Sequence, residues 1–122
     1  MSHAEGNYTT AGGILSHTEG YYTIAKGAYS HVSGLFNIED SYSNWPEWSA
    51  QASYAVGDKV KRTSGSTVTG YICKTAHGPS GFTDSFWTTD YKMNYAEIIG
   101  NGTSTDRRSN ARTLDWEGNE TL

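Results

Sequence analysis

Only one of the 122 residues, Cys73, is a cysteine, and only two are prolines. An internal disulfide is therefore excluded, and a lone cysteine between Ile72 and Lys74 is typical of a small buried side chain in a strand. The scarcity of proline beside fourteen glycines suits many tight turns between short strands. Long hydrophobic runs are missing too, so we expect neither membrane insertion nor a signal peptide in this chain.

Positive charge is also in short supply, since nine Lys and Arg residues face thirteen Asp and Glu residues and the formal net charge is −4. Nucleic-acid binding needs a basic surface, so we predict no nucleic-acid partner. Arg107, Arg108 and Arg112 lie among acidic residues, and we interpret this stretch as a solvated face of mixed charge. Hydrophobic residues make up only 35 %, but an aromatic content of 13 % is too high for a disordered chain.

The chain opens with three copies of one fourteen-residue phrase. The copies begin Ser2-His3-Ala4-Glu5-Gly6, Ser16-His17-Thr18-Glu19-Gly20 and Ser30-His31-Val32-Ser33-Gly34, and the third copy loses the pattern after Ile38. A short fixed period with glycine at a fixed place is typical of a coiled β-structure in which each turn stacks on the one before. Such architectures more often form shafts and binding platforms than catalytic pockets.

Side chains in the extended part of each copy should alternate between two faces, with Ser16 and Thr18 on one and His17 and Glu19 on the other. The small side chains suit the inside of a narrow coil, whose perimeter is about 46 Å at about 3.3 Å per residue. Three such coils bury too little apolar area to offset the entropy lost on ordering. We therefore expect a homo-oligomer, most simply a homotrimer with three-fold symmetry.

Imidazole and carboxylate side chains recur at the same phase of the repeat, as His3, His17, His31, Glu5 and Glu19. Stacked imidazoles at a symmetry axis could form a metal or anion site. Alternatively, His–Glu contacts between successive coils form a ladder that holds their register at the oligomer interface. Metal-binding histidines usually come in a compact ligand cluster, so we prefer the ladder and predict no metal ion and no cofactor.

The Ser-His-x-Glu-Gly phrases resemble the head repeats of trimeric autotransporter adhesins, and more closely those of phage and prophage tail-appendage proteins. The resemblance covers residues 2–40. It implies a trimeric left-handed parallel β-roll built from fourteen-residue coils. We therefore expect an all-β fold with the head repeats in residues 1–40.

The composition changes abruptly after residue 40, where three of the four Trp and both Pro lie close together. Residues 58–63 and 67–73 flank Ser64-Gly65-Ser66, which predicts a β-hairpin. The order of Trp48, Tyr54, Tyr71 and Trp87 resembles the small chitin-binding-like carbohydrate-binding modules, in which these would be core positions. We therefore expect an inserted β-module over residues 41–92.

Sugar binding by this module would need flat aromatic rings, because a pyranose has an apolar face that can lie on a ring. The family often has exposed aromatics where this chain has Thr75 and Ala76, so the rings must come from elsewhere. The candidate binding residues are Trp45, Trp48, His77, Phe82 and Phe86. The expected ligand is a bacterial surface glycan, either chitin-like or a cell-wall sugar, and a purely structural insert is the alternative.

Residues 93–122 predict a β neck, with strand patterns at 95–99 and 109–116 and a turn at Gly100-Asn101-Gly102-Thr103. This stretch resembles the neck of phage neck-appendage proteins, in which an autoproteolytic chaperone domain follows and assists trimer assembly. The resemblance would place such a domain beyond Leu122, and we expect the chain to be part of a longer polypeptide.

Catalytic signatures are missing from these residues, since neither an activated nucleophile nor a pair of catalytic carboxylates is recognisable. We predict that the chain is not an enzyme and has no catalytic residue. The expected function is that of a structural and receptor-binding segment of a trimeric phage or prophage tail appendage, located on the virion tail and used for host attachment. The alternatives are a scaffold upstream of the autoproteolytic domain and an extracellular bacterial trimeric adhesin.

Overall fold

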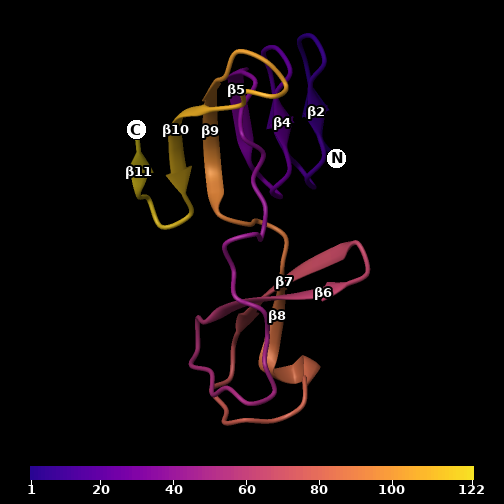
Figure 1. Cartoon of the computed structure of the whole chain (residues 1–122), viewed down its shortest axis with the longest axis vertical. Helices are drawn as coiled ribbons and strands as arrows, with labels where there is room; N and C mark the ends of the chain where they lie inside the picture. The colour runs from indigo at the N-terminus through magenta and orange to yellow at the C-terminus, as the bar shows by residue number, and fades with distance from the viewer. The chain divides into compact units, whose positions relative to one another are not determined.

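The computed structural model describes all 122 residues, and the chain is all-β with no α-helix. It divides into two units (Figure 1). The coil unit comprises Met1–Ser41 and Tyr91–Leu122, and the insert unit comprises Tyr42–Asp90. The segment expected as a neck thus lies in the same unit as the repeats. No helical segment of the structure has the length and apolarity needed to cross a membrane.

The repeats form parallel strands that pair at the period of the sequence. In the coil unit β1 (His3–Ala4), β3 (His17–Thr18) and β5 (His31–Leu35) lie side by side, with His3 opposite His17 and His17 opposite His31. The second halves of the first two copies pair in the same way as β2 (Thr10–Ala11) and β4 (Ile24–Ala25). The first two copies therefore each contribute one strand to each of two sheets, and the third contributes a strand to the first sheet only.

A fourth strand continues the row although it is distant in sequence. β9 (Tyr95–Asn101) pairs in parallel with β5 and sets Glu97 opposite His31 and Gly100 opposite Gly34. Residues 96–100, Ala-Glu-Ile-Ile-Gly, thus occupy the place of the Ser-His-x-Glu-Gly phrase. The strands β10 (Asn110–Asp115) and β11 (Glu120–Thr121) then follow antiparallel, which gives the sheet order β1-β3-β5-β9-β10-β11.

The glycine that closes each phrase is required by the close approach of successive coils. Gly6, Gly20 and Gly34 have φ of 106°, 111° and 94°, a region that disfavours any side chain. A Cβ atom on each of them would overlap the carbonyl oxygen of the glycine in the next coil, and for Gly34 that neighbour is Gly100. We name these three residues the glycine column. Gly100 continues it for a reason of its own, because a Cβ there would lie 2.5 Å from the Leu35 carbonyl oxygen and 2.8 Å from the Asn37 Cα.

The side chains that point into the coils are small and polar in the first coils and apolar in the later ones. Ser16 and Thr18 are buried, which confirms the predicted inner face. The Thr18 and Thr23 hydroxyls lie 2.7 Å apart and hydrogen-bond to each other. The position of Thr18 is taken by Val32 and then by Ile98 in the following strands, and both are fully buried in one cluster. The apolar core of the unit therefore lies at the strands nearest β9.

Two polar side chains occupy the point where the repeats stop. Asn37 is fully buried, and its side-chain amide accepts a hydrogen bond from the Ile24 N–H at 2.8 Å and donates one to the Ile24 carbonyl at 3.0 Å. It thus pairs with β4 as a backbone strand would. Arg108 donates to the carbonyl oxygens of Tyr22 and Asn37 at 3.1 and 3.2 Å and is partly buried, whereas Arg107 is exposed.

The carboxylate of Asp40 joins the segment that leaves the coil unit to the segment that returns to it. It accepts hydrogen bonds from the N–H groups of Ser41, Asn94 and Tyr95 and from the Asn94 side-chain amide, all at 2.8–2.9 Å. Burial raises the pKa of this carboxyl, while the hydrogen bonds act in the opposite direction. This side chain therefore helps to hold the two ends of the insertion together.

The insert unit is built on an antiparallel three-stranded sheet of β6 (Lys59–Ser64), β7 (Thr67–Cys73) and β8 (Trp87–Asp90), preceded by a short 3₁₀ helix, η1 (Asp84–Phe86). The register pairs Ser64 with Thr67, which confirms the predicted hairpin. The buried core consists of Val60, Cys73 and Trp87. The partly buried rings around it are Trp48, Tyr54, Tyr71, Phe82 and Phe86.

Candidate functional site

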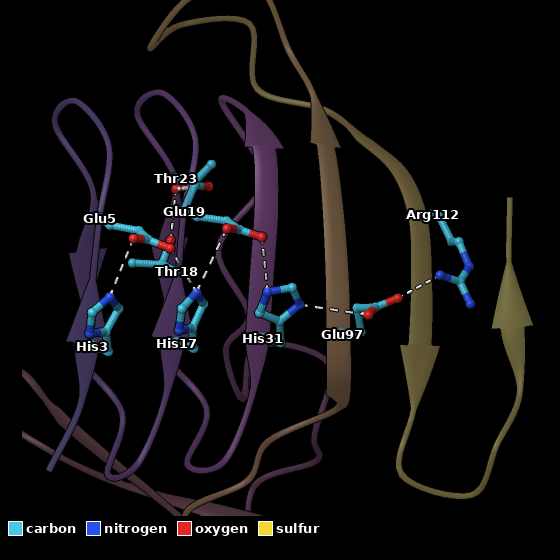
Figure 2. A network of polar contacts seen from close by, with 9 residues as sticks. All are labelled: His3, Glu5, His17, Thr18, Glu19, Thr23, His31, Glu97 and Arg112. Atoms are coloured by element: carbon cyan, nitrogen blue, oxygen red, sulfur yellow. Dashed lines mark hydrogen bonds and ion pairs between the residues drawn. The ribbon is translucent and has the colours of Figure 1, made fainter.

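The outer face of the first three parallel strands carries a row of alternating imidazoles and carboxylates, which we name the His–Glu ladder (Figure 2). Glu5 lies between two histidines, 3.6 Å from His3 Nε2 and 3.8 Å from His17 Nε2. Glu19 likewise lies 3.9 Å from His17 Nε2 and 3.3 Å from His31 Nε2. The ladder thus contains all five residues that the sequence singles out, and its contacts lie both within one coil and between successive coils.

The imidazole rings of the ladder do not stack uniformly. His3 and His17 lie nearly parallel, with ring centroids 4.9 Å apart and an interplanar angle of 8°. His17 and His31 are 5.0 Å apart but tilted by 37°. One side-chain nitrogen or oxygen from each of His17, Glu19 and His31 falls within 4.8 Å of the others, the geometry of a group that can hold a metal ion.

The ladder continues onto strands that the sequence pattern does not mark. Glu97 Oε2 lies 3.6 Å from His31 Nδ1, and the Glu97 carboxylate accepts a hydrogen bond from Arg112 (Figure 2). Arg112 also donates to Glu120, and this contact is the main cause that raises the pKa of the guanidinium. Sequence reasoning misses Glu97 because the phrase around it is lost. Its surviving signal is Gly100, three residues later.

Exposed ion pairs of this kind add little stability each, about 0–1 kcal/mol, because water screens them. The side chains of His17, His31 and Glu19 are 36 %, 41 % and 44 % exposed, so solvent reaches all three. The ladder therefore contributes more to the register of the coils than to the free energy of unfolding. Its accessible nitrogen and oxygen atoms also form a surface that a cation can approach.

A second surface of the coil unit is apolar and lies at the bends between strands. Tyr8, Tyr22 and Phe36 occupy equivalent places in three coils, and their rings stack at 4.5 and 4.9 Å. At the other bend Leu15 and Tyr29 occupy equivalent places and are exposed. All five residues have positive φ, which sets their side chains at the outside of the bends. The large apolar side chains exposed on this unit include Tyr8, Ile14, Leu15, Tyr29, Leu35 and Ile38.

In the insert unit Trp45 is only 4 % exposed. Its ring packs against Tyr42 at a centroid distance of 4.9 Å and lies so close to Gly70 that a Cβ there would be 2.9 Å from it. Trp45 therefore offers no open face to a sugar, which corrects the expectation that it forms part of a binding platform.

The other four candidate residues form two pairs on the core of the insert unit. Phe82 meets Trp48 edge-on at 5.5 Å, and His77 stacks on Phe86 at 4.4 Å. All four side chains are partly exposed. The guanidinium of Arg62, which sequence reasoning missed, lies 4.0 Å from the centroid of Phe82 and 5.3 Å from that of Trp48. We name Trp48, Phe82 and Arg62 the aromatic–guanidinium patch.

This patch combines apolar ring surface with a hydrogen-bond donor, as sugar-binding sites do. His77 is less free to take part, because its Nδ1 lies 2.7 Å from the Thr75 carbonyl oxygen and its ring also contacts Tyr54 and Trp87. Of the two pairs, the patch is therefore the better candidate for binding a sugar.

Comparison of the chain with protein-family models, curated proteins and solved structures finds no match.

Proposed function

We propose that the chain is a structural and receptor-binding segment of a trimeric phage or prophage tail appendage, in which the coil units associate and the insert units bind a bacterial surface glycan. The observation that carries the proposal is the distribution of side chains in the coil unit. Small and hydroxyl-bearing side chains fill the first coils, whereas large apolar ones lie outside at the bends. The resemblance of the repeated phrase to tail-appendage heads supports the same assignment.

Association of identical coil units would cover these exposed side chains. Leu15 and Tyr29 are each about half exposed, and Tyr8 is 66 % exposed. Because they recur from coil to coil, an identical unit beside them would meet them at the same spacing. Burying apolar surface contributes about 25 cal/mol per Å², so a row of such residues favours association substantially. A closed three-fold ring is the proposed form, as a left-handed β-roll would allow.

Glycan binding by the insert unit is supported by the partly exposed rings of the aromatic–guanidinium patch. A single small patch of this kind gives weak affinity. Three insert units in one trimer would raise the effective affinity if the bacterial surface offers several sugars within reach. The proposal therefore links the oligomer of the coil unit to the binding function of the insert unit.

Glycan binding is tested with the wild-type protein, by NMR with chitin oligosaccharides and with soluble peptidoglycan fragments. We expect the side-chain resonances of Trp48 and Phe82 to shift, and Trp48→Ala to weaken retention on insoluble glycan. The matched control is Val56→Ala, an exposed apolar residue of the same unit. Absence of any shift with either glycan would leave a scaffold role and contradict the binding half of the proposal.

Association is tested by replacing Leu15 and Tyr29 together with aspartate. We expect this double variant to have a smaller mass in solution than the wild type, because paired charges would be forced into the contact. Val56→Asp introduces one such charge at an exposed position of the insert unit and should leave the mass unchanged. If the double variant keeps the wild-type mass, the apolar bends are not the contact surface.

A further inference from the structure

We propose that the His–Glu ladder binds one divalent transition-metal ion per chain, with Zn²⁺ as the best-fitting ion, through His17, Glu19 and His31. Sequence reasoning preferred a ladder without metal because the histidines are spread over a repeat rather than clustered. Folding brings them into the compact cluster that the sequence lacks, since the coils stack the repeats on one another.

The three ligand atoms lie within 4.8 Å of one another, so a zinc ion would draw them closer together on binding. Zinc bonds of about 2.0–2.2 Å in a tetrahedral site set neighbouring ligand atoms about 3.4 Å apart. Glu19 Oε1 lies 3.3 Å from His31 Nε2, and the other carboxylate oxygen, Oε2, lies 3.9 Å from His17 Nε2. Two imidazoles and one carboxylate are a ligand set that zinc accepts, and the fourth position is left for water or for Glu5, which lies 3.8 Å from His17 Nε2.

The surroundings of His31 resemble those of a metal ligand in a second, independent way. A metal-bound histidine usually directs its other ring nitrogen at a carboxylate, which fixes the tautomer and the ring orientation. His31 has its Nε2 toward Glu19 and its Nδ1 toward Glu97, at 3.6 Å. Arg112 in turn holds Glu97 and is itself held by Glu120. Such a chain of supports would leave the Nε2 lone pair of His31 directed at the proposed ion.

The first step of the ladder lacks these features and provides an internal comparison. His3 has a carboxylate near its Nε2 alone, its ring is stacked flat on that of His17, and its side chain is 62 % exposed. The proposed site is therefore at the second step of the ladder only.

A bound ion would connect the second and third coils by coordinate bonds. These coils are already joined by β-sheet hydrogen bonds, so the ion would add stability to the coil unit rather than create its fold. The site lies within one chain and faces solvent, so the proposal holds whether or not the coil units form trimers.

The experiment is isothermal titration of ZnCl₂ into the full chain, after chelation of any bound metal and without an affinity tag. We expect one Zn²⁺ per chain, a loss of at least tenfold in affinity for His31→Gln and for Glu19→Gln, and wild-type affinity for His3→Gln. The last variant removes an equivalent histidine of the same ladder and is the matched control. Mg²⁺ and Ca²⁺, which prefer oxygen ligands, should not compete.

A second measurement uses only the wild-type protein and does not depend on whether a variant folds. During Zn²⁺ titration followed by NMR, the ring resonances of His17 and His31 should shift together, while those of His3 should shift far less. The proposal is overturned if Zn²⁺ does not bind, if His3→Gln weakens binding as much as His31→Gln, or if the three rings respond equally. Failure of the glycan or mass experiments would leave these outcomes unaffected.

Discussion

Replacing Asp40 with alanine should destabilise the coil unit strongly. The carboxylate is 5 % exposed and accepts hydrogen bonds from the backbone N–H groups of Ser41, Asn94 and Tyr95. Alanine would leave these donors without their acceptor, and each buried unpaired group costs about 1–3 kcal/mol. With water reaching some of the donors after the change, we expect a loss of about 3–5 kcal/mol in the free energy of unfolding.

The same carboxyl gives the prediction a pH signature. Burial raises the folded-state pKa of Asp40, so between the unfolded and the folded pKa the folded protein binds more protons than the unfolded chain. Its contribution to stability is therefore present below the ordinary aspartate pKa and is lost as the pH rises through the folded pKa. Asp40→Ala should remove this decrease in the free energy of unfolding with rising pH.

The assay is urea unfolding of the wild type and of Asp40→Ala, followed by circular dichroism at several pH values from the ordinary aspartate pKa upward. A midpoint for Asp40→Ala within the error of the wild type would refute the role assigned to the hydrogen bonds. A decline with rising pH that is identical in both proteins would refute the assignment of that decline to Asp40.

Three further substitutions test the coils and the last turn. Gly20→Ala should lower the free energy of unfolding more than Gly57→Ala does, as measured by urea titration. Both glycines have positive φ, but only at Gly20 would a Cβ meet backbone atoms. Equal effects would contradict the role assigned to the glycine column. Asn37→Ala should cost about 2–4 kcal/mol, since it leaves both backbone groups of Ile24 unpaired, and a near-neutral thermal midpoint would contradict this. Asp115 has a lowered pKa because Asn119 donates hydrogen bonds to it, so its contribution to stability is present above the ordinary aspartate pKa and is lost on acidification. Asp115→Ala should therefore reduce the loss of stability between neutral and acidic pH. A loss of the same size in the variant and the wild type would contradict this.

The repeats allowed much of the coil unit to be predicted. A period of fourteen residues with a fixed glycine predicts parallel pairing at that register, and the alternation around His17 predicts which side chains are buried. The sequence does not show the fourth strand as a continuation of the row, since 66 positions separate His31 from its partner Glu97 and the phrase keeps only Gly100. A repeat that follows a long insertion is not detected by a search for a fixed period.

The details of the site depend on tertiary contacts that no local pattern encodes. The stacking of coils brings His17, Glu19 and His31 together, but the tilt between the two rings and the support from Glu97 and Arg112 come from β5, β9 and β10. Likewise, Trp45 was a candidate because Thr75 and Ala76 stand where the family has exposed aromatics, and only the packing of Trp45 on Gly70 and Tyr42 shows that its ring is not available.

The measurement that bears most directly on the proposed function is sedimentation equilibrium of the untagged wild-type chain over a wide range of concentration. The account predicts a species of three times the chain mass of 13.3 kDa, held together by the apolar bends of the coil unit. A folded species that stays at 13.3 kDa at every concentration would contradict it.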